Sequence, residues 1–166
     1  MLHSPDVTPV TRRVLLERLD ARQERQFLSE AEFDRLRAVA VRLLPHDPAE
    51  IDLIGPLDAR LHSGLSGDGW RYADAPPDPE AYRALLAALP DDFETLSGER
   101  QDGALRTVQM SHARAFEDLL SELAETFFAH PLTQYRIGYV GFADAPGWPN
   151  VGPGELEVRE ETYGEQ

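Results

Sequence analysis

Residues 116–131 read FEDLLSELAETFFAHP, and this stretch decides the fold class. Phe and Leu recur in it at steps of three and four residues, which is the period of one helix face, until Pro131 ends the pattern. It is the longest apolar pattern in the chain, so we expect it to form the central helix of a bundle. Helical spacing continues through most of the sequence without an internal repeat. The sequence therefore predicts an all-α fold, a compact bundle of about five to seven helices.

The other helices are indicated by capping residues and apolar spacing. Ser29 and Glu32 have the form of a capping box, which predicts that a helix begins directly after Ser29. Asp78 is expected to be the N-cap of another helix, with Pro79 in its first position. The expected helices besides the central one cover 11–26, 30–44, 53–65, 79–89, 91–96 and 104–110, with Gly98 and Gly103 as breaks.

The chain is expected to consist of three segments. Residues 1–26 are expected to form a polar helix or arm, residues 27–150 a helical domain, and residues 151–166 a mobile acidic tail. Two stretches inside the domain contain many Gly and Pro residues. The first is a loop over 66–79, which encloses Trp70 and Tyr72 and is tacked to the core by them. The second covers 131–154, where five Gly and four Pro predict an irregular segment.

Missing residue types exclude several kinds of chemistry. The 166 residues include 16 Arg but no Lys and no Cys. Without Cys there is no thiolate nucleophile, Cys-ligated zinc, iron–sulfur cluster or disulfide, and without Lys there is no P-loop lysine or Schiff base. The net charge of -14 disfavours binding to nucleic acids. We therefore expect no nucleic-acid partner. Because no stretch approaches the roughly 20 apolar residues of a transmembrane helix, we also expect no direct insertion into a membrane.

No residues have the spacing of a catalytic or metal site. The five His residues form no His-x-x-x-His pair, and His46 and His130 both stand at expected helix C-termini, where they can interact with the last carbonyls. The run Ser63-Gly64-Leu65-Ser66-Gly67 does not fit a nucleophile elbow and indicates a helix C-cap. We expect no catalytic residue, metal ligand or cofactor on this chain. An enzyme that uses carboxylates stays open, and a buried Asp or Glu in a cleft would favour it.

Aromatic residues and one isolated charge mark the segment after Pro131. Arg136 is the only charged residue between 131 and 143. Its stem could cover an aromatic ring at the surface, or the residue could anchor an interface, because Arg, Tyr and Trp are enriched at binding hot spots. We expect the aromatic residues to insert and anchor this segment. The candidate partner-binding residues are Tyr135, Arg136, Tyr139, Phe142 and Trp148.

Four segments, in this order, give the chain a resemblance to the gluconate 2-dehydrogenase subunit 3 family. They are FLSEAEF at 27–33, LRAVAVRLLP at 36–45, the stretch 116–131 with its double Phe before Pro131, and GYVGF at 138–142. The family often has a Tyr-Gly-Gly-Asn-like turn where this chain has Leu132-Thr-Gln-Tyr135, and often a twin-arginine export signal. Arg12-Arg13 has a similar place but lacks the apolar core of such a signal.

The resemblance implies a non-catalytic accessory subunit that binds and stabilises a flavin-dependent sugar or sugar-acid dehydrogenase. FAD would belong to this large partner subunit, and a cytochrome subunit could join the same complex. The expected location is the cytoplasm, or the periplasm if a signal-bearing partner exports the subunit. The alternative is a free-standing helical module for protein interaction or stress response that has no dehydrogenase partner.

Overall fold

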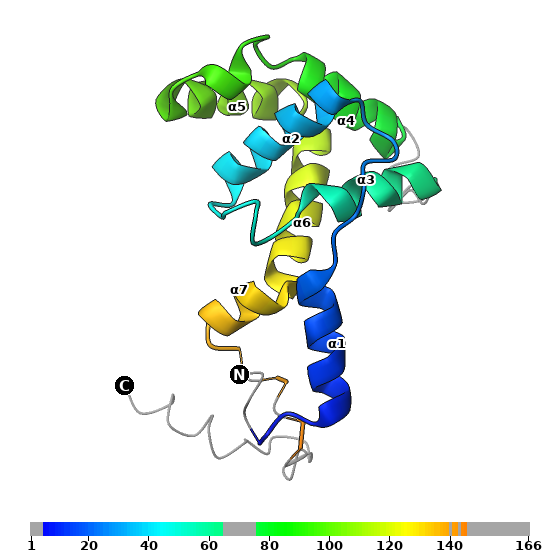
Figure 1. Cartoon of the computed structure of the whole chain (residues 1–166). Coiled ribbons are helices and arrows are strands. Elements are labelled where there is room, and N and C mark those ends of the chain that lie inside the picture. The colour runs from blue at the N-terminus through cyan, green and yellow to red at the C-terminus, as the bar shows by residue number, and fades with distance from the viewer. Residues whose placement is uncertain (1–4, 65–75, 140, 143, 146–166) are drawn as a thin grey trace, which may run out of the picture. The chain divides into compact units, whose positions relative to one another are not determined.

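The computed structural model describes residues 5–64, 76–139, 141–142 and 144–145, and these residues confirm the all-α prediction (Figure 1). Within these ranges the chain forms seven α-helices and one short 3-10 helix, without a strand. The helices are α1 (Pro9–Asp20), α2 (Glu30–Leu43), α3 (Ile54–Ser63), α4 (Asp78–Ala87), η1 (Phe93–Thr95), α5 (Gly98–Ser111), α6 (Ala113–Ala129) and α7 (Pro131–Arg136).

The chain divides into two compact units. The larger, here called unit 2, is Arg22–His130, and the smaller, unit 1, joins the residues up to Ala21 with those from Pro131 onward. These limits do not coincide with the expected segments 1–26 and 27–150. The expected tail, 151–166, lies outside the described residues, as do Trp70 and Tyr72 of the expected 66–79 loop.

Helix α6 is the central element of unit 2, as its apolar pattern predicts. It contacts α3, α4 and α5, while α2 packs against α3, α4, α5 and η1 (Figure 1). These helices bury most of the apolar positions expected from their spacing, although Phe128 of α6 is 50% exposed. The most deeply buried core residues on these elements include Leu36, Val39, Leu57, Tyr82, Leu85, Phe93, Val108, Leu119 and Leu123.

The capping box that begins α2 is confirmed. The Ser29 hydroxyl accepts a hydrogen bond from the Glu32 amide at 3.3 Å, and the Glu32 carboxylate accepts one from the Ser29 amide at 2.8 Å. Burial raises the pKa of Glu32, but the hydrogen bonds from Ser29 and Arg83 outweigh it, so this pKa lies below its ordinary value. The charged form of Glu32 therefore contributes to the cap at neutral pH.

Several expectations about helix boundaries are wrong, among them those at Asp78, Gly98 and Gly103. Helix α4 already includes Asp78, its N-cap is Pro77, and the Asp78 carboxylate binds Arg60 at 2.9 Å instead of capping the helix. Helix α5 begins at Gly98 and continues through Gly103, although both were expected to be breaks. Its packing against α6 offsets the cost of about 1 kcal/mol for Gly within a helix.

The largest correction concerns residues 131–136, which form helix α7 where the composition predicted irregular structure. Pro131 is the first residue of this helix, a position that needs no amide hydrogen. Gly138 follows its end with φ of 73° and accommodates the left-handed turn that stops it. Pro131 and Gly138 therefore lie at the boundaries of a helix, and the composition alone did not distinguish this from an irregular segment.

Smaller expectations about helix ends are confirmed. Gly64, with φ of 70°, is the C-cap of α3. His130 is the C-cap of α6, and His46 follows α2 with its Nδ1 atom 2.5 Å from the carbonyl oxygen of Leu44. These positions agree with a structural role for both imidazoles.

Candidate interaction surface

Large apolar side chains are exposed at the C-terminal end of α7 in unit 1. Tyr135 is 59% exposed, Ile137 60% and Tyr139 49%. Arg136, which lies among them, is exposed as well. We call Tyr135, Arg136, Ile137, Tyr139 and Phe142 the aromatic segment. Its tyrosines are not inserted into a core, contrary to the expectation that they anchor the segment, and their rings are available to a binding partner.

The turn after α7 fixes the direction in which Tyr139 leaves the helix. The Tyr139 amide donates to the carbonyl of Gln134 at 2.8 Å, and the Gly138 amide donates to that of Tyr135 at 3.2 Å. This pair of bonds is the Schellman arrangement, which satisfies the last helical carbonyls. The backbone around Tyr139 is thus specified by hydrogen bonds.

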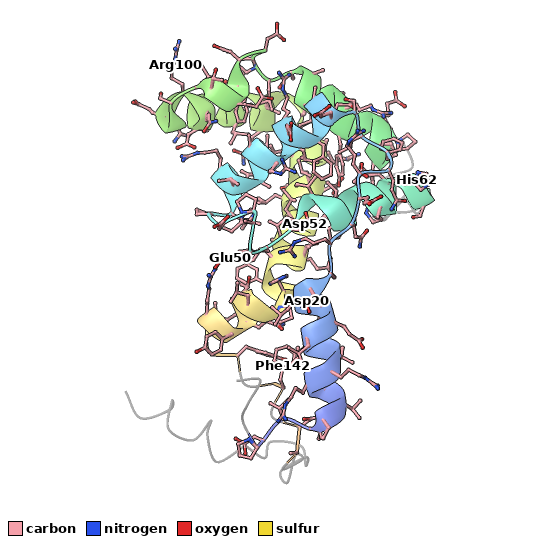
Figure 2. The ribbon with its side chains drawn as sticks, viewed as in Figure 1. Asp20, Glu50, Asp52, His62, Arg100 and Phe142 are labelled. Carbon is pink, nitrogen blue, oxygen red and sulfur yellow. The ribbon has the colours of Figure 1, made fainter. Side chains whose placement is uncertain are left out.

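Two aromatic rings pair directly after this turn. The ring centroids of Tyr139 and Phe142 are 5.3 Å apart and their planes are 82° apart, an edge-to-face contact. Gly141 makes this pairing possible, because a Cβ atom at this position would lie 2.2 Å from the Tyr139 hydroxyl oxygen. Figure 2 shows Phe142 on the segment that follows α7.

The structure brings together four of the five candidate partner-binding residues. Tyr135 and Arg136 lie on the last turn of α7, and Tyr139 and Phe142 follow within six residues. Trp148 lies outside the described residues.

Sequence reasoning did not single out the exposed apolar residues of α1, which packs against α7. Val10, Val14 and Leu16 are exposed, whereas Leu15 of the same helix is buried. The four-residue spacing of Val10 and Val14 places these two on one side of the helix.

A carboxylate joins the end of the described chain to the start of α1. Asp144 accepts hydrogen bonds from the Thr8 amide at 2.7 Å and from the hydroxyls of Thr8 and Thr11, each at 2.6 Å. The hydrogen bonds from Thr11 and Thr8 lower the pKa of Asp144 to about 2. Because the pKa of Asp144 is depressed in the folded state, its charged carboxylate stabilises that state. This stabilisation is complete at pH values above the ordinary pKa of Asp and is lost as the pH falls towards 2.

In unit 2, a second charged cluster links α3, α4 and α6. The Arg60 guanidinium binds both carboxylate oxygens of Glu122 and donates to Asp78 at 2.9 Å, and the Tyr82 hydroxyl donates to Glu122 at 3.1 Å. Burial raises the pKa of Tyr82, and the negative charge of Glu122 raises it further. Burial lowers the pKa of Arg60, but the bonds to Glu122 outweigh it and the net shift is upward. The raised pKa values keep Arg60 charged and Tyr82 neutral at neutral pH, and the hydrogen bonds that join the four side chains are typical of a structural network.

Asp58 on α3 is a buried carboxylate that the sequence did not indicate. Its side chain is completely inaccessible, and it accepts hydrogen bonds from the backbone amides of Gln26, Phe27 and Leu28. The bond to Leu28 is 2.7 Å long. Asp58 therefore fixes the chain that leads into α2, and its oxygens are occupied by backbone donors.

Unit 2 also has an open, polar cavity of about 540 Å³. Its charged lining consists of Arg22, Arg25, Glu30, Asp34, Arg37 and Asp52. Three positive and three negative side chains give the cavity no preference for an anion or a cation. Among the residues that the structure describes, no group of three or more His, Asp or Glu side chains could hold a metal ion.

None of the helices in the described ranges has the length and apolar character needed to cross a lipid bilayer. Comparisons of the chain with known protein families, curated proteins and solved structures found no match.

Proposed function

We propose that this chain is a non-catalytic accessory subunit that binds a larger protein through the aromatic segment. The observation that carries the proposal is the exposure of Tyr135, Ile137 and Tyr139 within five residues at the C-terminal end of α7. Solvent-exposed apolar groups that gather in this way are typical of protein-binding surfaces, and Tyr and Arg are enriched at the residues that contribute most binding energy.

The aromatic segment itself carries little charge. Arg136 is the only charged residue between 131 and 143, whereas unit 1 as a whole contains five Arg and nine acidic residues and residues 22–130 contain 11 Arg and 21 acidic residues. A protein that contacts this short stretch therefore meets little of the negative charge of the chain.

The proposed partner is the large subunit of a flavin-dependent sugar or sugar-acid dehydrogenase, with a cytochrome subunit as a further member of the complex. This choice rests on the resemblance of the four sequence segments, two of which lie on α2 and α6 and one of which, 138–142, belongs to the aromatic segment. In this proposal the partner's FAD carries the electrons, and this chain stabilises the folded partner by binding it.

The test is affinity purification of the tagged, full-length chain from its native cells. We expect a larger protein in near-equal amount, with flavin absorption bands in the eluate. The Tyr135→Ala/Tyr139→Ala double variant should lose that protein, because both rings are removed from the surface. Met110→Ala is the matched control, since Met110 is 78% exposed on α5 in unit 2 and should retain the partner.

A colourless chain that purifies alone would contradict the proposal and favour the free-standing helical module. A flavoprotein that the double variant retains as well as the wild type would support a complex but place its interface elsewhere.

A further inference from the structure

We propose that unit 1 opens as a separate cooperative step while unit 2 stays folded. In the open state α1 and α7 have separated, and the hydrogen bonds that join Asp144 to Thr8 and Thr11, here called the Asp144 clamp, are broken. The inference concerns a conformational equilibrium of this chain alone, so it holds or fails independently of the proposed function.

The order of the segments along the chain permits such a step. Unit 2 is one continuous stretch, Arg22–His130, whereas unit 1 consists of two stretches that lie before and after it in the sequence. The two stretches of unit 1 can therefore separate without breaking any contact inside unit 2. Sub-global opening of this kind is common when one part of a structure is less stable than the rest.

Unit 1 buries few side chains among the residues that the structure describes. Its buried residues there are Val7, Leu15, Pro131 and Thr133. Each α-helix of unit 2, in contrast, buries at least three residues of its own. Because apolar burial is the dominant favourable contribution to folding, the closing of unit 1 should be stabilised less than the folding of unit 2.

Two buried polar groups on α7 lower the stability of the closed state further. The Thr133 hydroxyl and the side-chain carbonyl oxygen of Gln134 are buried, and neither forms a hydrogen bond within the described part of the chain. Thr133 is only 2% exposed. A polar group that is buried without a hydrogen bond destabilises the folded state, and opening returns both groups to water.

The Asp144 clamp opposes this opening, because it joins the two stretches of unit 1 directly. Asp144 Oδ1 accepts from the Thr8 amide at 2.7 Å, and Oδ2 accepts from the hydroxyls of Thr8 and Thr11 at 2.6 Å each. Thr8 is the N-cap of α1, whose first turn has no acidic residue of its own. The carboxylate therefore also interacts favourably with the positive end of the helix dipole. Hydrogen bonds to a charged acceptor are stronger than neutral ones, so the clamp should contribute much of the stability of the closed state.

The test is native-state hydrogen exchange of the full-length chain at urea concentrations below the unfolding transition. The probes in unit 1 are the amides of Arg12, Ile137 and Tyr139, each of which donates to a backbone carbonyl. The probes in unit 2 are the amides of the buried residues Leu36 and Val39 of α2.

We expect the unit 1 probes to have protection factors at least about 100-fold smaller than those of the unit 2 probes. They should also share one urea dependence that is weaker than that of the unit 2 probes, because opening of unit 1 exposes less surface than global unfolding. Equal protection and equal urea dependence in the two units would overturn the inference, since the chain would then open as a single body.

Two variants should shift the opening of unit 1 in opposite directions. Asp144→Asn removes the charged acceptor and should accelerate exchange at Arg12, Ile137 and Tyr139 at least about tenfold. Thr133→Val keeps the shape of the side chain but removes the unpaired hydroxyl, so it should slow exchange at these probes about threefold. Acceleration in Asp144→Asn that is confined to Arg12 would show local fraying of α1 and would contradict a cooperative opening.

A variant in unit 2 provides the reciprocal test. Glu122→Ala destabilises unit 2 and should accelerate exchange at Leu36 and Val39 at least about tenfold, whereas the unit 1 probes should change by less than about twofold. Equal acceleration in both units would overturn the inference. Asp20→Asn, at an exposed position on α1, is the control for the loss of one charge and should leave all probes unchanged.

Discussion

Replacement of Asp58 by Ala is expected to lower the free energy of unfolding of unit 2 by about 3 kcal/mol. The substitution removes the acceptor of three backbone amides, one of which belongs to the buried residue Leu28. A buried donor without a partner costs about 1–3 kcal/mol, and bonds to a charged acceptor are stronger than neutral ones. Urea denaturation followed by helical circular dichroism measures the change.

Two further variants test whether the loss of stability in Asp58→Ala comes from the lost hydrogen bonds or simply from the removal of an acidic side chain. Asp58→Asn keeps one carbonyl oxygen and should lose less stability than Asp58→Ala. Asp47→Ala is the matched control, because the exposed Asp47 carboxylate accepts from a single amide, that of Ala49 at 2.8 Å, and should cost less than about 1 kcal/mol. Equal midpoints for Asp58→Ala and Asp47→Ala would show that the buried carboxylate does not hold the chain before α2.

Replacement of Glu122 by Ala is the second large effect and should cost about 2–3 kcal/mol. It leaves the Arg60 guanidinium with Asp78 as its carboxylate partner and takes the acceptor from the buried Tyr82 hydroxyl. Breaking a buried ion pair costs about 3–5 kcal/mol, and we reduce this figure because the side chains of Arg60 and Glu122 are 24% and 20% exposed. Urea denaturation of unit 2 again provides the measurement.

Glu125→Ala is the control for Glu122→Ala, because Glu125 is an exposed acid on the same helix. It should change the free energy of unfolding by less than about 0.5 kcal/mol. If Glu122→Ala and Glu125→Ala are equally stable, the charged network between α3, α4 and α6 contributes nothing to the free energy of unfolding of unit 2. If Arg60→Met/Glu122→Met is more stable than Glu122→Ala, the penalty comes from the unpaired groups and not from the loss of the ion pair itself.

The helices that the sequence predicts well are those in which local signals and packing agree. In α2, the Ser29–Glu32 capping box and the buried Phe33, Leu36 and Val39 define the same element. In α6, the three- and four-residue spacing also marks the buried face, with Phe116, Leu119 and Leu123 in the core. Both the start signal and the period are properties of neighbouring residues, so the sequence contains them directly.

The boundaries that sequence reasoning missed depend on residues far away in the chain. Helix α1 ends at Asp20, short of the expected residue 26, because the chain beyond it is held in another conformation by Asp58 of α3. Gly103 lies inside α5, since the buried Gln101, Leu105 and Val108 on the same helix outweigh its low propensity. Local propensity cannot reveal such contacts.

For the candidate surface, the sequence indicated the residues but not their arrangement. Tyr135, Arg136 and Tyr139 were found from aromatic and charge patterning, and the structure shows them exposed. The attachment of α1 to Asp144 could not be predicted, because the bonds from Thr8 and Thr11 to Asp144 span more than 130 residues. No local pattern indicates that residues 6–11 meet residues 144 and 145.

The most direct test of the central claim is the dissociation constant of the purified flavoprotein for this chain, compared between the wild type and Tyr135→Ala/Tyr139→Ala. Two hot-spot rings are worth about 2 kcal/mol or more, so the double variant should bind at least about 30-fold more weakly, with Met110→Ala unchanged. Dissociation constants for the double variant and the wild type that agree within about twofold would contradict the claim that the aromatic segment is the partner-binding surface.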